Sequence, residues 1–197
     1  MRRLLEFHRS PNSVKVRIGL AVKGLEYEAE EMYAADRSPM MEAAGWPLTP
    51  VLIDGDVVMR DSLSILHYLD ANYREGPALV PAERDDIRSG EALLLLLRPQ
   101  LLRIQWNLAP QAGLAEEERD LDRVEVGRRT LNDELLQLEG RLARRPWLVG
   151  EAMSLFDIVL ACDLLPARPP SRFVEQSPMW GFYREHFALD PDREHVA

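Results

Sequence analysis

The sequence predicts a first part of mixed helices and strands, followed by a second part made only of helices. Short apolar segments with strand-like and helix-like spacing alternate up to residue 75. Beyond the turn-rich stretch at 75–81, no alternating strand pattern follows, and helix-forming residues dominate. We therefore expect a sheet-containing domain at residues 1–75, a linker at 76–84 and an all-helical domain at 85–197.

The first part opens with a predicted strand, helix and strand. Leu4, Leu5 and Phe7 form a short apolar strand, which the polar stretch at 8–12 ends. From residue 13 onward, apolar residues recur at helical spacing until a glycine stops the helix at position 24. Residues 25–30 then alternate between apolar and acidic side chains, which is the period of a half-exposed strand.

The rest of the first part predicts a short helix, a hairpin and a longer helix. Two prolines and a glycine between residues 36 and 47 leave room only for a short irregular helix. Apolar segments at 51–53 and 57–59 flank Asp54-Gly55-Asp56, which is a strong hairpin signal. Asp61-Ser62 precedes an apolar helical stripe at 63–69, and either residue would cap that helix. The predicted order is β-α-β-(α)-β-β-α.

The second part predicts long helices. Residues 87–108 are apolar along much of their length, and Pro99 removes a backbone donor there, so we expect a kink or a break. A further long helix is predicted from Glu116 to Arg144. Ser154 and Asp157 fit a helix-starting box, and we interpret them as structural. The tail carries aromatic residues that predict one docked amphipathic helix: Trp180, Phe182, Tyr183 and Phe187.

The composition is that of an ordinary globular protein, with 46% hydrophobic and 29% charged residues. Because 24 basic and 33 acidic residues give a net charge of −9, the surface should repel phosphate backbones, and nucleic acid is not an expected partner. The longest apolar stretch, residues 92–97, is far shorter than the roughly 20 residues of a membrane span. The start of the chain has no apolar run of signal-peptide length, and we expect a cytoplasmic protein that does not bind membranes.

The sequence predicts neither a metal nor a nucleotide cofactor. The four histidines share no metal-ligand spacing, and no glycine-rich phosphate loop occurs. The single cysteine, Cys162, excludes an internal disulfide framework and favours a reducing compartment. It lies on an apolar helical stretch, and we interpret it as a buried small hydrophobe. The tryptophans are interpreted as packing residues, although Trp46, between Gly45 and Pro47, could lie exposed over a pocket.

The order of elements and several local motifs resemble those of cytosolic glutathione transferases, over nearly the whole chain. Residues 10–17, Ser-Pro-Asn-Ser-Val-Lys-Val-Arg, look like the segment that carries the catalytic serine in the serine-type classes. Thr49-Pro50 looks like the residue and cis-proline that start the third strand of that family. Asp61-Ser62 resembles its acid–serine pair for the γ-glutamyl end, and residues 150–157 resemble its capping box. The resemblance implies a thioredoxin-like domain followed by an all-α domain.

The resemblance also implies glutathione as co-substrate and assigns roles to particular residues. Ser10 would be catalytic, and the backbone of Thr49 would pair with the cysteinyl part of glutathione. The residues implied to bind glutathione are Ser10, Asn12, Thr49, Pro50, Asp61 and Ser62. One departure concerns Leu48, which stands where the family often has a lysine. The glycyl carboxylate therefore has no identified partner, and a basic residue elsewhere would have to replace that lysine: Arg9, Arg37 or Lys15.

The chemistry of these residues fits activation of a thiol. A serine hydroxyl cannot act as a general base at neutral pH, so Ser10 would donate a hydrogen bond that favours thiolate over thiol. The positive end of the following helix favours an anion at the same place by roughly 0.3–1 kcal/mol. The thiolate would attack a small hydrophobic electrophile. The second part would supply an apolar pocket for it, with three candidate wall residues: Leu102, Arg103 and Trp106.

Each motif also has an interpretation without a ligand. Ser10 before Pro11 is an ordinary turn residue, and Ser13 could cap the helix in its place. Asp61-Ser62 can cap a helix while also binding a ligand. We predict a glutathione transferase with a role in detoxification that forms a homodimer by family analogy. The alternative is a non-catalytic interaction or regulatory module of the stringent-starvation-protein type. Peroxidase or disulfide-reductase activity is disfavoured, because it usually relies on a cysteine at the Ser10 position.

Overall fold

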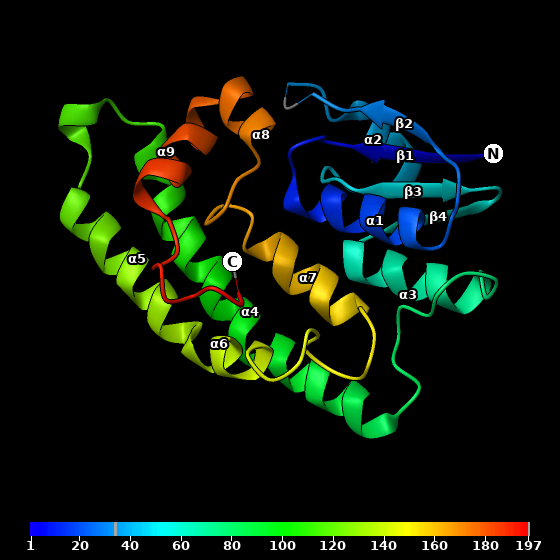
Figure 1. Cartoon of the computed structure of the whole chain (residues 1–197). Helices are drawn as coiled ribbons and strands as arrows, with labels where there is room; N and C mark the ends of the chain where they lie inside the picture. Colours follow the sequence, from blue (N-terminus) through cyan, green and yellow to red (C-terminus); the bar gives the residue numbers. More distant parts are fainter. Residues whose placement is uncertain (34, 197) are drawn as a thin grey trace. The chain divides into compact units, whose positions relative to one another are not determined.

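The computed structural model describes residues 1–33 and 35–196, which form two compact units. The first unit consists of Met1–Arg84 together with Ala152–Cys162, and the second of Asp85–Glu151 together with Asp163–Ala197. The sheet belongs to the first unit, and the described part of the second unit is helical (Figure 1). The predicted fold class is confirmed, while the predicted domain limits at residues 75 and 85 stay a prediction.

One four-stranded sheet forms the centre of the first unit. Its strands are β1 (Arg2–Glu6), β2 (Glu28–Glu31), β3 (Val51–Asp54) and β4 (Val57–Arg60). They lie in the order β2-β1-β3-β4, with β1 parallel to β2 and antiparallel to β3. The predicted hairpin of β3 and β4 is confirmed, and its turn uses Gly55 at a φ of 60°. Because the Leu25 amide still donates to Leu20 at the helix exit, β2 begins three residues later than expected.

Four helices complete the first unit: α1 (Pro11–Val22), α2 (Ser38–Ala44), α3 (Ser62–Asn72) and α7 (Leu155–Asp163), whose last residue is counted with the second unit. Helices α1 and α3 lie side by side (Figure 1), and a Cβ at Gly19 would approach Leu66 Cδ2 to 2.3 Å. Helix α2 packs on β3 and β4. The Leu155 amide at the start of α7 donates to the Leu79 carbonyl at 2.7 Å. The core is built from fully buried side chains of the sheet, α1 and α3: Leu4, Leu5, Val16, Leu20, Val51, Leu52, Ile65, Leu66 and Leu69.

The second unit contains α4 (Arg84–Ala112), a 3-10 turn η1 (Glu116–Glu118), α5 (Leu121–Glu134), α6 (Leu136–Leu142), α8 (Ser171–Gln176) and α9 (Pro178–His186). Helix α4 continues through Pro99, so the chain does not break there. Buried leucines at 94, 97 and 101 extend the same packed stripe across the proline, and this packing favours one helix.

Two predictions about the second unit are wrong. A single helix from Glu116 to Arg144 does not form, because Asp120 accepts a hydrogen bond from the Arg123 amide at 2.9 Å and starts α5 as a separate helix. A second division at Leu135 separates α5 from α6. The tail forms two helices instead of one, since α9 starts anew at Pro178. Its four aromatic side chains are buried as expected. No helix in residues 1–33 and 35–196 is long and apolar enough to cross a bilayer.

Candidate functional site

Ser10 lies at the start of α1, directly after the loop that follows β1. Its backbone is extended, with φ −68° and ψ 125°, and Pro11 occupies the first helical position. The Ser10 amide donates to the Phe7 carbonyl at 2.8 Å, which fixes the turn. Among the described residues, its hydroxyl makes no helix-capping hydrogen bond. The Ser13 hydroxyl, which was the alternative cap, accepts from the Phe7 amide at 3.3 Å instead.

Charged side chains hold the loop before Ser10. Arg17 Nη2 donates to the His8 carbonyl at 2.9 Å, and the Glu31 carboxylate accepts from the His8 amide at 3.0 and 3.1 Å. Arg17 also contacts the His8 ring and forms an ion pair with the buried Glu6, Nε to Oε2 at 3.5 Å. Burial raises the pKa of Glu6, Arg17 opposes that rise, and Glu31 adds to it. This cluster could not be predicted from the sequence, because its members come from β1, the loop after it, α1 and β2.

Glu6, His8 and Glu31 are also close enough to share a metal ion, since one ligand atom of each lies within 4.8 Å of the others. Histidine spacing in the sequence did not reveal this grouping. The guanidinium of Arg17, however, already contacts His8 and Glu6. The Arg17 side chain thus already supplies a positive charge to this cluster. We interpret the cluster as a support for the Ser10 loop.

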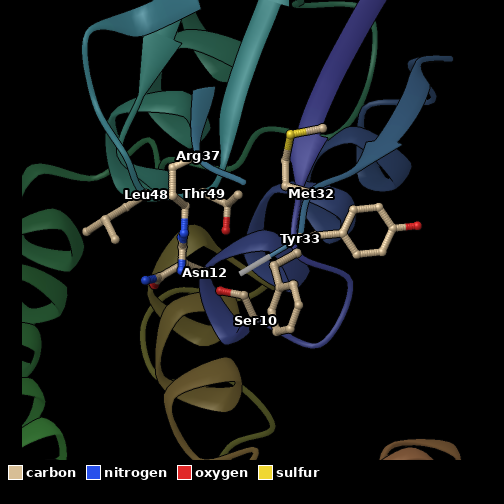
Figure 2. Close-up of a pocket in the computed structure, with 8 residues that line it drawn as sticks. Ser10, Asn12, Met32, Tyr33, Arg37, Leu48 and Thr49 are labelled. Carbon is tan, nitrogen blue, oxygen red and sulfur yellow. The ribbon is translucent and has the colours of Figure 1, made fainter. Parts of the chain in front are cut away.

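The peptide bond between Thr49 and Pro50 is cis, as predicted. Pro50 is buried, and the residue after it begins β3. Thr49 is half-buried and faces the same cavity as Ser10 (Figure 2). The cis-proline segment therefore lies beside the start of α1.

Asp61 and Ser62 open helix α3. Asp61 has a φ of 72°, a conformation that few residues other than glycine adopt, and such outliers are concentrated at functional sites. Its carboxylate accepts from the Ser64 amide at 2.9 Å, so the predicted capping role is confirmed. Ser62 is 3% exposed, and its hydroxyl donates to Asn12 Oδ1 at 3.4 Å. This contact joins the start of α3 to the start of α1.

Two adjoining cavities contain all six residues that the resemblance assigned to glutathione. The first cavity, of about 240 Å³, is lined by Phe7, Ser10, Asn12, Met32, Tyr33, Arg37, Leu48 and Thr49. The second cavity, of about 310 Å³, is lined by Asn12, Trp46, Leu48, Thr49, Pro50, Arg60, Asp61 and Ser62. They share Asn12, Leu48 and Thr49. One elongated ligand could therefore extend from Ser10 to Asp61.

The three basic residues considered for the glycyl carboxylate take different positions. The Arg37 side chain extends between Leu48 and Thr49 toward Asn12 inside the first cavity (Figure 2), and its Nη1 donates to the Pro47 carbonyl at 3.0 Å. Lys15 is fully buried, with Nζ donating to Asn12 Oδ1 at 2.9 Å. The Arg9 guanidinium lies 5.4 Å from the centroid of the Phe7 ring and lines neither cavity.

The predicted walls of the electrophile pocket lie on α4, in the second unit. Leu102 is half-buried and Arg103 is exposed, with Nη2 donating to Gln100 Oε1 at 2.7 Å. Trp106 is 78% exposed, so it is not a core packing residue. Their role stays a prediction. Cys162 is buried as expected.

Sequence reasoning missed several lining residues. Phe7, Met32 and Tyr33 line the first cavity, and Arg60 lines the second. Arg60 is the last residue of β4 and directly precedes Asp61. Its position next to a predicted site residue was therefore the sequence signal that could have identified it as a lining residue. Trp46 is 42% exposed and lines the second cavity, in agreement with the possibility raised from its flanking glycine and proline.

Comparison with protein-family models identifies both parts of the chain. Residues 4–77 match the model described as the N-terminal domain of glutathione S-transferase, and residues 85–177 match its C-terminal domain. The chain belongs to the cytosolic glutathione transferase superfamily. All the residues that line the two cavities lie within the part of the chain that matches the N-terminal domain.

Similar members of the superfamily carry different names. A probable maleylacetoacetate isomerase of Vibrio cholerae is 29% identical over 171 residues, covering 80% of this chain and 77% of that protein. A stringent starvation protein A homolog of Pasteurella multocida is 31% identical over 151 residues, covering 75% of this chain and 66% of that protein. A glutathione S-transferase structure from Methylobacillus flagellatus, with glutathione bound, has a TM-score of 0.70 at 23% identity, covering 100% of this chain and 99% of that one. Membership of the superfamily therefore does not by itself identify a reaction.

Proposed function

We propose that this protein is a serine-type glutathione transferase that joins the thiol of glutathione to a small hydrophobic electrophile. The observation that carries the proposal is the position of Ser10. Its hydroxyl does not cap α1, yet it lines a cavity at the start of that helix, beside Thr49. A hydroxyl donor and a helix N-terminus at one place both favour a thiolate over a thiol.

The two cavities support a definite orientation of glutathione. Its γ-glutamyl end would lie at Asp61 and Ser62 in the second cavity, and the cysteinyl backbone would pair with Thr49. The glycyl carboxylate would lie near Arg37 in the first cavity, which replaces the lysine missing at Leu48. Arg37 is the choice among the three basic residues because it alone of them lines a described cavity. This orientation brings the sulfur to the Ser10 hydroxyl.

The proposed chemistry needs no proton acceptor at Ser10. The Ser10 hydroxyl donates to the sulfur, which lowers the pKa of the bound thiol and releases its proton to water. The thiolate electron pair then forms a carbon–sulfur bond with the electrophile, and the leaving group departs with the pair of the bond that breaks. Leu102, Arg103 and Trp106 are the candidate electrophile contacts. We further propose a cytoplasmic homodimer, which light scattering at the dimer mass would support and at the monomer mass would refute.

A second candidate is a non-catalytic regulatory module of the stringent-starvation-protein type. Similarity to the Pasteurella protein and the leucine at position 48 favour it. Under this alternative the cavities would be vestiges, and no thiol conjugate would form. The chain would bind a partner protein instead.

Two measurements distinguish the candidates. Calorimetry with millimolar glutathione should give saturable binding, and absence of binding would refute the transferase proposal. Turnover should then be measured with a panel of electrophiles that includes aryl halides, epoxides and maleylacetoacetate. A conjugate supports the transferase, and isomerisation without net consumption of glutathione would assign an isomerase instead. Binding without any reaction would favour the regulatory module.

A further inference from the structure

Side chains from outside the turn hold the turn that presents Ser10. Within the turn, the Ser10 amide donates to the Phe7 carbonyl at 2.8 Å. The His8 carbonyl, two residues before Ser10, accepts from Arg17 on α1 at 2.9 Å. The His8 amide donates to the carboxylate of Glu31 on β2. The position of the Ser10 hydroxyl therefore depends on where these two side chains hold the peptide groups of His8.

The guanidinium of Arg17 uses its three nitrogens on different partners. Nη2 donates to the His8 carbonyl, Nη1 contacts the His8 ring, and Nε lies 3.5 Å from Glu6 Oε2. The Arg17 side chain is 16% exposed, so little water competes for these contacts. A planar guanidinium holds several partners in one fixed geometry, which a single ammonium group cannot do. Arg17 thus links the end of β1 to the turn that follows it.

Glu6 supplies the negative charge that orients Arg17. The Glu6 side chain is 3% exposed, and within the described part of the chain its Oε2 accepts no hydrogen bond. A buried carboxylate is costly unless a positive charge compensates it, and the Arg17 guanidinium is that charge. Moving Arg17 away would leave the Glu6 charge buried and uncompensated. This cost restricts the guanidinium to the position from which it reaches His8.

We propose that Arg17 is a positioning residue for thiol activation, because it fixes the His8 carbonyl and so directs the Ser10 hydroxyl at the sulfur of glutathione. The proposal rests on the proposed transferase function and adds a residue that lines neither described cavity. A displaced hydroxyl donor stabilises a thiolate less, although glutathione still binds through its other contacts. Loss of Arg17 should therefore lower kcat and raise the pKa of the bound thiol, with little change in KM.

Two substitutions of Arg17 separate its shape from its charge. For Arg17→Gln we expect a kcat about tenfold lower, a KM for glutathione unchanged within about twofold, and a higher thiol pKa, measured from thiolate absorbance against pH. This variant also loses stability, because Glu6 is left without a compensating charge. Arg17→Lys keeps the charge but has no planar fork, so it should retain most of the thermal midpoint while kcat stays about tenfold low. A wild-type kcat in Arg17→Lys would overturn the positioning role.

A double variant distinguishes positioning from a general disturbance of the site. If Arg17 acts through the Ser10 hydroxyl, Arg17→Lys should cause no further loss of kcat in a Ser10→Ala background.

Arg3→Gln is the matched control, because Arg3 also joins β1 to β2 through an ion pair. Its Nη2 donates to Glu30 Oε2 at 3.1 Å, and among the described residues none of its hydrogen bonds reaches the turn. Arg3→Gln should leave kcat, KM and the thiol pKa unchanged. A tenfold loss of kcat in this variant as well would show that Arg17 has no special role.

The outcomes separate the role of Arg17 from the proposed enzyme. Losses of kcat that add in the double variant, or a change in KM in place of kcat, overturn the positioning role and leave the transferase in place. A loss in Arg17→Lys that disappears in the Ser10→Ala background supports the role. A wild-type protein that forms no conjugate with any electrophile overturns the transferase and the positioning role together.

Discussion

The two adjoining cavities differ in the kind of side chain that surrounds them. The first combines the Ser10 hydroxyl and Arg37 with the apolar side chains of Phe7, Met32 and Tyr33. The second has adjacent charges of opposite sign, Arg60 and Asp61. A hydroxyl at a helix start among apolar walls is suited to changing the state of a sulfur, whereas paired charges are suited to holding one end of a ligand. Changes in the first cavity should therefore alter kcat, and changes in the second should alter KM.

The largest effect is expected from Ser10→Ala in the first cavity. Loss of the donor should lower kcat for conjugation about a hundredfold, in the range known for removal of one oxyanion donor. The pKa of the bound thiol should rise, so activity should recover toward higher pH. Stopped-flow absorbance of the thiolate against pH measures this shift. Ser10→Thr keeps a hydroxyl and should retain most of the activity, and a Ser10→Ala enzyme with wild-type kcat would contradict the role of Ser10.

A smaller effect is expected from Asp61→Asn in the second cavity. Asparagine tolerates the φ of 72° and can still accept from the Ser64 amide, so the helix cap survives while the charge is lost. KM for glutathione should rise about tenfold with kcat unchanged. Steady-state kinetics and thermal unfolding measure the two consequences separately.

Asp61→Ala is the matched comparison, because it removes the charge and the cap together. It should raise KM similarly and also destabilise the fold by about 1 kcal/mol. An Asp61→Asn enzyme that keeps the wild-type KM would show that Asp61 serves the helix only.

Arg37→Gln tests an exception to the expectation that changes in the first cavity alter kcat. Arg37 lies in the first cavity, but its proposed role is to bind glutathione. KM for glutathione should rise about fivefold, the modest effect expected of an exposed charge pair. The glycyl monoester of glutathione has no charged carboxylate at that end, and its KM should not respond. Arg9→Gln is the control. A loss of affinity in that variant, with Arg37→Gln unaffected, would transfer the assignment to Arg9.

Asp70 lies outside both cavities, and its replacement should leave kcat and KM unchanged. Burial raises the pKa of Asp70, but hydrogen bonds from Lys23 (2.7 Å) and from the Leu79 and Val80 amides hold it below its ordinary value of 3.8. A carboxyl with a lowered folded pKa stabilises the protein above pH 4, and this stability is lost as pH falls through the folded pKa.

The measurement for Asp70 is the thermal midpoint against pH. Asp70→Asn leaves the Lys23 ammonium, whose side chain is 1% exposed, without its carboxylate, so it should lower stability by about 2 kcal/mol at neutral pH. Its midpoint should vary less between pH 6 and 3 than that of the wild type. Asp85→Asn removes an exposed surface pair and should change nothing. Identical acid profiles for the wild type and Asp70→Asn would refute the assignment.

Local sequence signals predicted the strands and the start of the site well. The cis bond of Thr49-Pro50 was predicted from the family resemblance. Glycine in Asp54-Gly55-Asp56 predicted the hairpin, because a few neighbouring residues determine that turn. Asp61 was predicted as a helix cap for the same reason.

Features that depend on distant contacts could not be predicted. The division of residues 116–144 follows from Asp120, whose amide donates to Gln111 Oε1 at 2.8 Å, a partner on another helix. Pro99 alone does not tell whether packing on both sides will keep a helix continuous. Tyr33 lines the first cavity because the fold brings the segment after β2 close to the start of α1, and no spacing in the chain records that arrangement.

Helix α7 has a consequence for the order in which the protein is made. The segment Ala152–Cys162 belongs to the unit that begins at Met1, although the whole of α4, α5 and α6 is synthesised between them. On the ribosome, part of the apolar surface of the first unit must therefore stay exposed to solvent until α7 has emerged. A nascent chain stopped after α3 will be protease-sensitive and prone to aggregate, and one extended past Cys162 will be protected. Gene fusions that transplant the first unit need both segments.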